Sequence, residues 1–259
     1  MSFGINHYLC SQKINNMKKI YALLALFCPL MAFSQVTYVT EDEKHCIWQP
    51  GVKLTFEMFE NTNPDSANIR SMKEHNRQLI PFTGFWHVVD IHKVPKMKKK
   101  ERKKLWLPDK GYFCAPFSKF QSCIIARDSF DLKCAQLIWD AMELGTRVSR
   151  MWLDNLEKKI GGPSDNLYTM YLMTAAKEGK DYSDYVIYQI LSKVQIPRDQ
   201  DKYLEYRRKI DEELESTSKF ATSKEEATRL LLGKPIDPDM EQAESIVGVL
   251  GEGRDSSEE

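Results

Sequence analysis

One uninterrupted helical pattern in the middle of the chain limits its fold more than any other feature. Between Leu132 and Lys159 apolar residues recur at spacings of three and four, and no proline interrupts them. The pattern is carried by Leu132, Ala135, Trp139, Met142 and Leu153. Asp131 stands at its start as a cap or first-turn acid, and Gly161-Gly162-Pro163 ends it. The spacing predicts one long amphipathic helix.

Short strand-like runs precede this helix. They are rich in β-branched and aromatic residues and are bounded by charged or Pro-Gly segments. The predicted strands are Val36–Thr40, Cys46–Gln49, Val52–Phe56 and Phe82–Ile91, with a hairpin of Lys110–Phe117 and Gln121–Ala126 around Ser118-Lys119. Ser66–Asn76 fits a helix or a strand equally well. The first half of the chain therefore predicts a small antiparallel sheet.

Further helical patterns follow the long helix, over Leu167–Lys177, Tyr182–Lys193, Asp199–Ser216 and the shorter Lys224–Leu232. Because strands and helices are segregated along the chain, the order favours an α+β fold over a parallel α/β fold. We expect one α+β domain over residues 35–232. Residues 233–259 are predicted to be a disordered acidic tail, since the segment from Pro235 holds eight acidic residues and one base, Arg254.

The first 34 residues resemble a targeting segment. Met17-Lys18-Lys19 precedes an apolar run from Ile20 to Phe33 and the small residue Ser34, which is the pattern of a secretory signal peptide after an upstream extension. The run is too short to cross a hydrocarbon layer of about 30 Å comfortably. We therefore expect export to the periplasm or the extracellular space, with no integral membrane span after cleavage.

Charge and cysteine content narrow the function further. Removal of Lys13, Lys18 and Lys19 with the signal peptide changes the net charge from zero to about −3, which does not indicate a nucleic-acid partner. The four remaining cysteines are Cys46, Cys114, Cys123 and Cys134. Since an exported protein folds under oxidising conditions, we predict a possible disulfide between Cys114 and Cys123, which flank the expected hairpin.

Familiar catalytic and metal-binding motifs are missing from the sequence. It has no nucleophile elbow, phosphate-binding loop or dinucleotide fingerprint, and no motif that indicates a cofactor. The histidines of the mature chain are His45, His75, His87 and His92. His87 and His92 stand five apart on a predicted strand and therefore face opposite sides, so they are not expected to bind one metal ion together.

Two surface features suggest binding. Residues 93–104 carry eight basic side chains and one acid, and the densest part is Lys98, Lys99, Lys100, Arg102, Lys103 and Lys104. A solvated loop is the simpler interpretation, and an anion-binding patch for an envelope component is the alternative. The late tyrosines Tyr168, Tyr171, Tyr182, Tyr185 and Tyr188 are expected to pack between helices, with a glycan-stacking surface as the alternative.

The long helix carries a family resemblance. Its segment KCAQLIWDAMELGTR resembles the active helix, H-E-Q-x-H-F-D-x-x-E, of a domain of unknown function in secreted bacterial proteins to which zinc-dependent peptidase activity is ascribed. Gln136, Leu137, Trp139, Asp140 and Glu143 fit this pattern, with Arg147 and Arg150 following. Trp48, Pro50, Leu54 and Phe59 resemble the opening phrase of the family, and Tyr203, Tyr206, Ile210 and Leu214 its closing helix. The resemblance implies a zincin-like fold.

The departures from this pattern decide the expected chemistry. Cys134 stands at the first histidine position, Ala135 at the glutamate position and Ile138 at the second histidine position. In an H-E-x-x-H helix the two imidazoles bind one zinc ion and the glutamate is the base for its water. Isoleucine has no donor atom and alanine cannot move a proton, so we expect no catalytic residue and no bound metal.

The sequence thus favours a pseudoenzyme: an exported protein with a metallopeptidase-like scaffold that acts by binding or structure in the cell envelope, on an unknown protein or envelope component. The alternative is an active secreted hydrolase whose displaced site uses Cys134 or the strand histidines. The two hypotheses differ in what they place beside Cys134 and Ile138. A closed apolar environment favours the first, and a histidine in a cleft favours the second.

Overall fold

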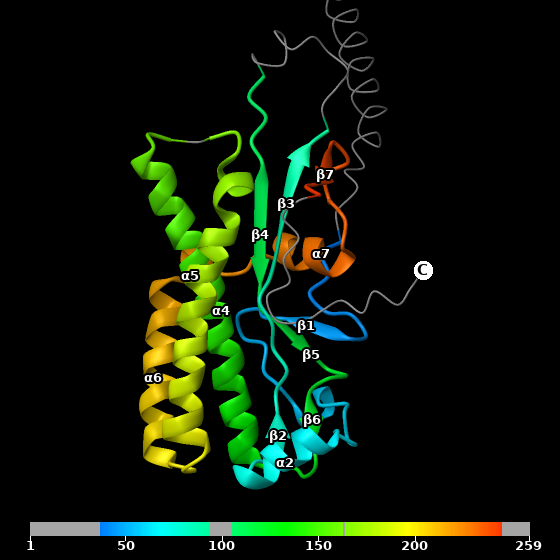
Figure 1. Cartoon of the computed structure of the whole chain (residues 1–259), viewed down its shortest axis with the longest axis vertical. Coiled ribbons are helices and arrows are strands. Elements are labelled where there is room, and N and C mark those ends of the chain that lie inside the picture. Colours follow the sequence, from blue (N-terminus) through cyan, green and yellow to red (C-terminus); the bar gives the residue numbers. More distant parts are fainter. Residues whose placement is uncertain (1–36, 94–104, 163, 245–259) are drawn as a thin grey trace, which may run out of the picture. The chain divides into compact units, whose positions relative to one another are not determined.

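The computed structural model describes residues 37–93, 105–162 and 164–244. From Tyr38 onward these residues belong to one folded unit, and the expected signal peptide, residues 1–34, lies outside the described residues. Within this unit a helical layer of α4 (Ser129–Lys159), α5 (Leu167–Ile190) and α6 (Gln200–Ser216) lies beside the strands (Figure 1). The α+β class with small antiparallel sheets is confirmed.

The long central helix is confirmed and begins slightly earlier than expected. The side chain of Asp128, and not that of Asp131, caps α4 by accepting hydrogen bonds from the backbone of Phe130 and Asp131. Asp131 is the acid of the first turn, and the helix ends at Lys159, before the glycine pair. The helix α6 is capped in the same way by Asp199.

Two other helices are short and well capped. The predicted helix α7 (Lys224–Leu232) has a capping box between Ser223 and Glu226 and ends at Gly233, whose φ is +65°. The ambiguous segment after Asp65 is a helix, α2 (Ser66–Glu74), because the side chain of Asp65 accepts a hydrogen bond from the backbone of Asn68.

The two helices expected over Leu167–Lys177 and Tyr182–Lys193 form one continuous helix, so that prediction was wrong. The helix α5 passes through Gly179 without a break and continues into a π-helical turn, η3 (Leu191–Gln195). No proline lies between the two predicted segments. Gly179 packs against Gly145 of α4, where a side chain would collide with the facing helix, so the close approach of the two helices requires glycine here.

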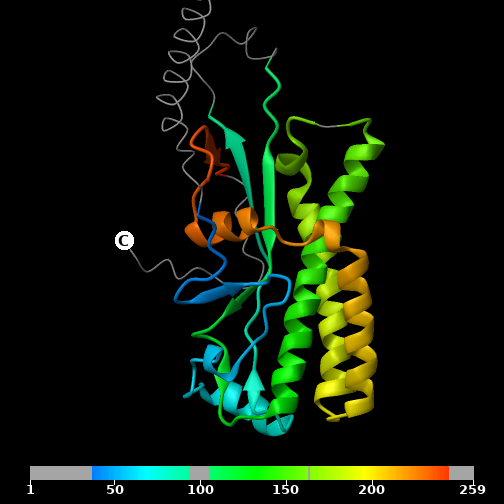
Figure 2. The ribbon, with the colours of Figure 1, turned by 180° about the vertical axis from the view of Figure 1, so that it is seen from behind.

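The strands form three small antiparallel sheets. The strand β3 (Trp86–His92) is central in the largest sheet, between β4 (Lys110–Cys114) and β7 (Met240–Gln242). The other two sheets pair β1 (His45–Ile47) with β5 (Pro116–Ser118), and β2 (Leu79–Ile80) with β6 (Cys123–Ile124). Figure 2 shows these strands from behind, with α4 alongside them.

Three strand predictions were wrong. The runs Lys110–Phe117 and Gln121–Ala126 do not form a hairpin, since β5 pairs with β1 and β6 with β2. Residues 52–55 are irregular and lead into the short 3-10 helix η2 (Phe56–Met58), and residues 37–40 form no strand. These runs are too short to specify their own partners, so the burial of residues such as Phe117 and Ile47 decides the pairing.

The folded unit also extends beyond the expected boundary at residue 232. Strand β7 pairs with β3 through Asp90, Ile91 and His92, and Ala243 donates its backbone N–H to Val89 O at 3.0 Å. Residues 233–244 are therefore part of the fold and not of a disordered tail. Residues 245–259 lie outside the described residues.

The disulfide expected between Cys114 and Cys123 is not formed. Both residues are free thiols, as are Cys46 and Cys134, and all four are buried. Cys114 lies in β4 beside α7, whereas Cys123 lies in β6, which belongs to a different sheet. The disulfide was expected because the two cysteines flank a predicted hairpin, and that hairpin does not form. Among the described residues, no helix has the length and apolar character needed to cross a membrane.

Candidate functional site

The three positions that the family resemblance aligns with zinc ligands and a base are all buried in α4. Cys134 and Ala135 are fully buried and Ile138 is 6% exposed. Cys134 and Ile138 pack with Ile190, Val194 and Ile210 in an apolar cluster between α4, α5, η3 and α6. Ala135 packs on the other side, in the cluster that joins α4 to the strands. Cys134 and Ile138, which lie one turn apart on α4, are therefore enclosed by aliphatic side chains.

The thiol of Cys134 is unreactive in this environment. Burial raises its pKa to about 12, with a smaller contribution from the negative charge of Asp131. The thiolate is the form that attacks carbonyl carbons and binds zinc, so at neutral pH the group is a protonated apolar side chain. This arrangement does not support nucleophilic or metal-ligating chemistry by Cys134.

Asp140, which fits the resemblance pattern, has a structural role. One carboxylate oxygen accepts hydrogen bonds from Trp48 Nε1 at 2.7 Å and from Gln136 Nε2 at 2.9 Å. The other oxygen accepts from Arg207 of α6, which also pairs with Asp211. Asp140 is 2% exposed, and it joins the N-terminal segment, α4 and α6 through three donors. A carboxylate with this many partners has no free oxygen to offer a substrate.

Glu143 forms a second buried network one turn further along α4. Its oxygens accept from Arg147 Nε at 2.8 Å, from Thr146 Oγ1 at 3.0 Å, and from the backbone and hydroxyl of Thr222 at 3.0 and 2.6 Å. Arg147 is 2% exposed, and its guanidinium lies 5.0 Å from the ring centre of Trp48. The network therefore ties α4 to the segment that enters α7.

Two further residues that fit the pattern, Gln136 and Trp139, are also structural. Gln136 Oε1 accepts the backbone N–H of Leu54 at 2.8 Å, and Trp139 Nε1 donates to Ala115 O at 3.0 Å. Gln136, Trp139, Asp140 and Glu143, here called the α4 framework, thus hold the long helix to the strands and to α6. Sequence reasoning missed their partners Arg207 and Thr222, because both are distant in the chain and belong to no motif.

The histidines do not complete a displaced hydrolase site. His87 is buried, stacks on Phe113, and has its Nε2 3.4 Å from the sulfur of Met173. Within the described parts of the chain, no hydrogen bond joins His87 or His92 to Cys134, Asp140 or Glu143. Those same parts contain no group of three or more His, Cys, Asp or Glu side chains with the geometry to hold a metal ion.

The basic run and the late tyrosines, which the sequence suggested as binding surfaces, differ in what the structure describes of them. The basic residues Lys98, Lys99, Lys100, Arg102, Lys103 and Lys104 lie outside the described residues. The late tyrosines do not act alike: Tyr168 packs on Gly111, Tyr171 on Trp152, and Tyr182 donates its hydroxyl to Glu213. Tyr185 and Tyr188 are each 65% exposed and project away from the core. Packing therefore accounts for the first three only.

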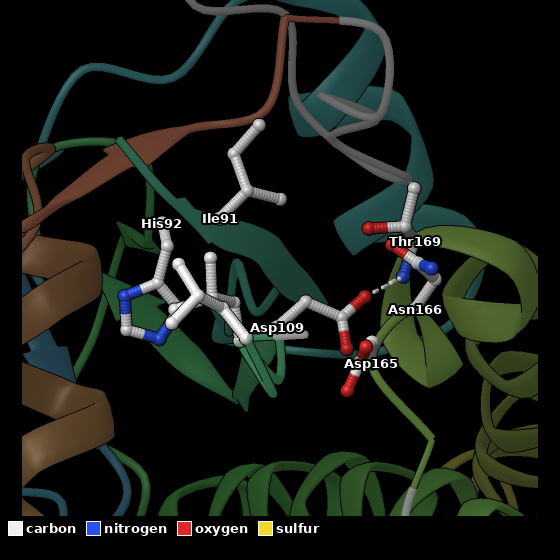
Figure 3. Close-up of a pocket in the computed structure, with 8 residues that line it drawn as sticks. Ile91, His92, Asp109, Asp165, Asn166 and Thr169 are labelled. Atoms are coloured by element: carbon white, nitrogen blue, oxygen red, sulfur yellow. Dashed lines mark hydrogen bonds between the residues drawn. The ribbon is translucent and has the colours of Figure 1, made fainter. Parts of the chain in front are cut away.

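A pocket of about 280 Å³ lies elsewhere, where α5 begins (Figure 3). It is lined by Ile91, His92, Leu105, Leu107, Asp109, Asp165, Asn166 and Thr169. Asp109 is 5% exposed, and its two oxygens accept the backbone N–H groups of Tyr168 at 3.2 Å and Thr169 at 2.5 Å. Asp109 thus caps the first turn of α5 from outside the helix. No sequence pattern predicts this pocket, because its walls come from three separate segments.

Comparison of the chain with models of protein families, with curated proteins and with solved structures gave no match. The assignment of function therefore depends on the chemistry of the two sites described above.

Proposed function

We propose that this chain is an exported, non-catalytic protein with a metallopeptidase-like scaffold, and that it acts by binding or structure in the cell envelope. One observation carries the proposal. The positions of the expected zinc ligands and base, Cys134, Ala135 and Ile138, are enclosed in apolar packing, whereas every residue of the α4 framework has a structural hydrogen bond. The framework of the helix is retained and its chemistry is not.

A catalytic site with polar side chains lowers the stability of the helix layer that contains it. Two imidazoles and a carboxylate pointing into a wet cleft keep polar groups at the centre of a helix layer. A thiol at Cys134 and a sec-butyl group at Ile138 let α5 and α6 close over one face of α4, and the methyl group of Ala135 packs toward the strands. The cluster of Ile138 with Ile190, Val194 and Ile210 has this arrangement. A scaffold that gains stability in this way loses access for substrate.

Zinc analysis of the purified full-length chain tests the loss of chemistry. We expect no zinc retained above the blank after dialysis, and no hydrolysis of unfolded casein with or without added zinc. Cys134→Ser is the variant and Cys114→Ser the matched control, since both thiols are fully buried. Near-stoichiometric zinc that is lost in Cys134→Ser and kept in Cys114→Ser would contradict the proposal.

Export is tested separately. When the full chain is produced in a bacterium, we expect an exported product whose N-terminus, read by mass spectrometry, follows Ser34. Retention of the intact chain in the cytoplasm would contradict the envelope location. It would leave the loss of zinc chemistry unaffected.

A further inference from the structure

The pocket where α5 begins has buried acceptors without partners. Asp165 Oδ1 and Thr169 Oγ1 are shielded from solvent, and neither has a hydrogen-bond partner in the structure. Both residues line the pocket, and Figure 3 shows the Asp165 carboxylate beside that of Asp109. A shielded acceptor without a donor is unfavourable, so a ligand that donates hydrogen bonds at this end would relieve the cost.

The polar end of the pocket also carries two carboxylates, of which Asp109 already accepts two backbone hydrogen bonds from the first turn of α5. No ion pair joins Asp109 or Asp165 to a described basic side chain. Of the lysines that directly adjoin lining residues in the sequence, Lys104 lies outside the described residues, and Lys93 and Lys110 have other partners. Lys93 donates to Pro238 O at 2.6 Å, and Lys110 lies 3.9 Å from Asp237. This end of the pocket therefore favours a cation.

Part of the pocket lining is apolar. Ile91, Leu105 and Leu107 supply its aliphatic surface. The volume of about 280 Å³ is large enough for a cationic head with a short methylene stem. Lysine and arginine side chains have this form, because their charged heads bind carboxylates while their stems pack along apolar surface.

The surroundings of the pocket indicate a protein as the source of that cation. Trp106, which follows the lining residue Leu105, is 62% exposed. Met170, which follows the lining residue Thr169, is 65% exposed, and Met173 on the next turn is 45% exposed. Exposed tryptophan and methionine that adjoin pocket-lining residues in the chain are typical of protein interfaces, in which a central anchor is surrounded by apolar contacts.

We propose that the pocket formed by Asp109, Asp165 and Thr169 receives a lysine or arginine side chain from a partner protein, with apolar neighbours of that side chain packing on Trp106 and Met170. The inference rests on the proposed binding role and specifies which side chains the partner protein presents. The anchor carries the positive charge, and this chain supplies the acidic pocket.

The first experiment uses small probes on the full-length chain. Binding of n-pentylamine, n-butylguanidine and the neutral 1-pentanol is followed by NMR at the backbone amides of Tyr168 and Thr169. We expect the two cations to bind about tenfold more tightly than the alcohol, because only they form charge-assisted hydrogen bonds. Equal binding of all three, or no binding of the cations, would overturn the proposal.

The second experiment locates the binding and uses matched variants. Asp165→Asn removes a pocket carboxylate with little change in shape, and Asp184→Asn removes an exposed carboxylate on α5. We expect pentylamine affinity to fall about tenfold in the first and to stay unchanged in the second. An unchanged affinity in Asp165→Asn, with wild-type melting temperature, would overturn the assignment of the pocket.

A third measurement separates a protein partner from a free amine. The capped tripeptide Leu-Lys-Leu is compared with Gly-Lys-Gly, each against wild type and Trp106→Ala. We expect the leucine peptide to bind more tightly, and this gain to disappear in Trp106→Ala. If pentylamine binds and neither peptide does, the ligand is a free amine and the protein partner is refuted. None of these outcomes depends on zinc, so this inference and the loss of zinc chemistry can fail independently.

Discussion

At the scale of single residues, the Glu143–Arg147 pair is the most sensitive point of the α4 framework. Both side chains are at most 2% exposed, and the carboxylate accepts four hydrogen bonds. Breaking a buried ion pair from one side leaves the other charge without a partner. We therefore expect Glu143→Gln to lower the free energy of unfolding by about 3 kcal/mol, measured by urea denaturation.

The control for this variant is an exposed ion pair on the same helix. Asp154 pairs with Lys158 at 2.7 Å, one turn before the end of α4, where water screens both charges. Asp154→Asn should leave the urea midpoint essentially unchanged. Equal effects of the two substitutions would show that the pair between Glu143 and Arg147 contributes no more than a surface contact.

His87 should make the stability of the protein depend on acid. Burial lowers its pKa from 6.5 to about 4, so the unfolded chain binds a proton in a range where the folded chain does not. Stability is then fully present above pH 6.5 and falls as the pH drops toward 4, by about 2–3 kcal/mol at pH 4.5 from this group alone. His87→Phe should remove this part of the loss of stability at low pH.

Urea midpoints at pH 7 and 4.5 check the prediction. Phenylalanine suits the site because His87 already packs against Phe85, Phe113 and the sulfur of Met173. His75→Phe serves as the control, since His75 is only half-buried at the end of α2 and makes none of these contacts. An identical pH dependence in His87→Phe and the wild type would refute the role of His87.

At the scale of helices and strands, the crossing of α4 and α5 depends on two glycines. A Cβ at Gly145 would lie 2.6 Å from the carbonyl oxygen of Gly179, and a Cβ at Gly179 would overlap the carbonyl of Gly145 and Ser149 Oγ. Ser149 Oγ also donates to Ala175 O at 2.7 Å across the same interface. The backbones of the two helices are therefore in direct contact.

Gly179→Ala should separate the helices despite the better helix propensity of alanine. We expect a loss of about 2 kcal/mol or more, because the overlap is with backbone that cannot rotate away. The exposed neighbouring substitution Glu178→Ala should have almost no effect. Thermal unfolding followed by circular dichroism measures both, and an unchanged midpoint for Gly179→Ala would contradict this account of the crossing.

Sequence reasoning succeeded for elements whose signals are local. The helices α4, α6 and α7 were predictable because Ser223, Asp199 and the glycines after Lys159 mark their ends within a few residues. It failed where distant contacts decide. The pairing of β5 with β1 and the continuity of α5 through Gly179 depend on residues far away in the chain, which short patterns do not report.

At the scale of the whole folded unit, β7 protects the free edge of β3. Met240 is 2% exposed, and Gln242 Oε1 accepts from Arg229, whose guanidinium also forms a two-pronged pair with buried Asp90. A chain ending at Asp239 should be less stable by about 3 kcal/mol than one ending at Glu244, from the lost burial of methionine and the lost hydrogen bonds. Equal urea midpoints would contradict a structural role for β7.

The candidate sites show the same division between what is local and what is distant. The absence of donor atoms at Ala135 and Ile138 could be predicted from the residue types alone, since no fold gives isoleucine a lone pair. The role of Asp140 as the link between Trp48 and Arg207 could not. Nor could the pocket beside Asp109, whose walls meet only after the sheet and α5 have packed.

Three of the buried thiols in the described residues can report how often the protein partially opens. Cys46, Cys114 and Cys134 lie in three different apolar clusters, and burial raises the pKa of each thiol. An alkylating reagent in water can react with each one only while the cluster around it is open. The labelling rates of these cysteines, read by mass spectrometry, would therefore rank the three parts of the molecule by how often each exposes its interior.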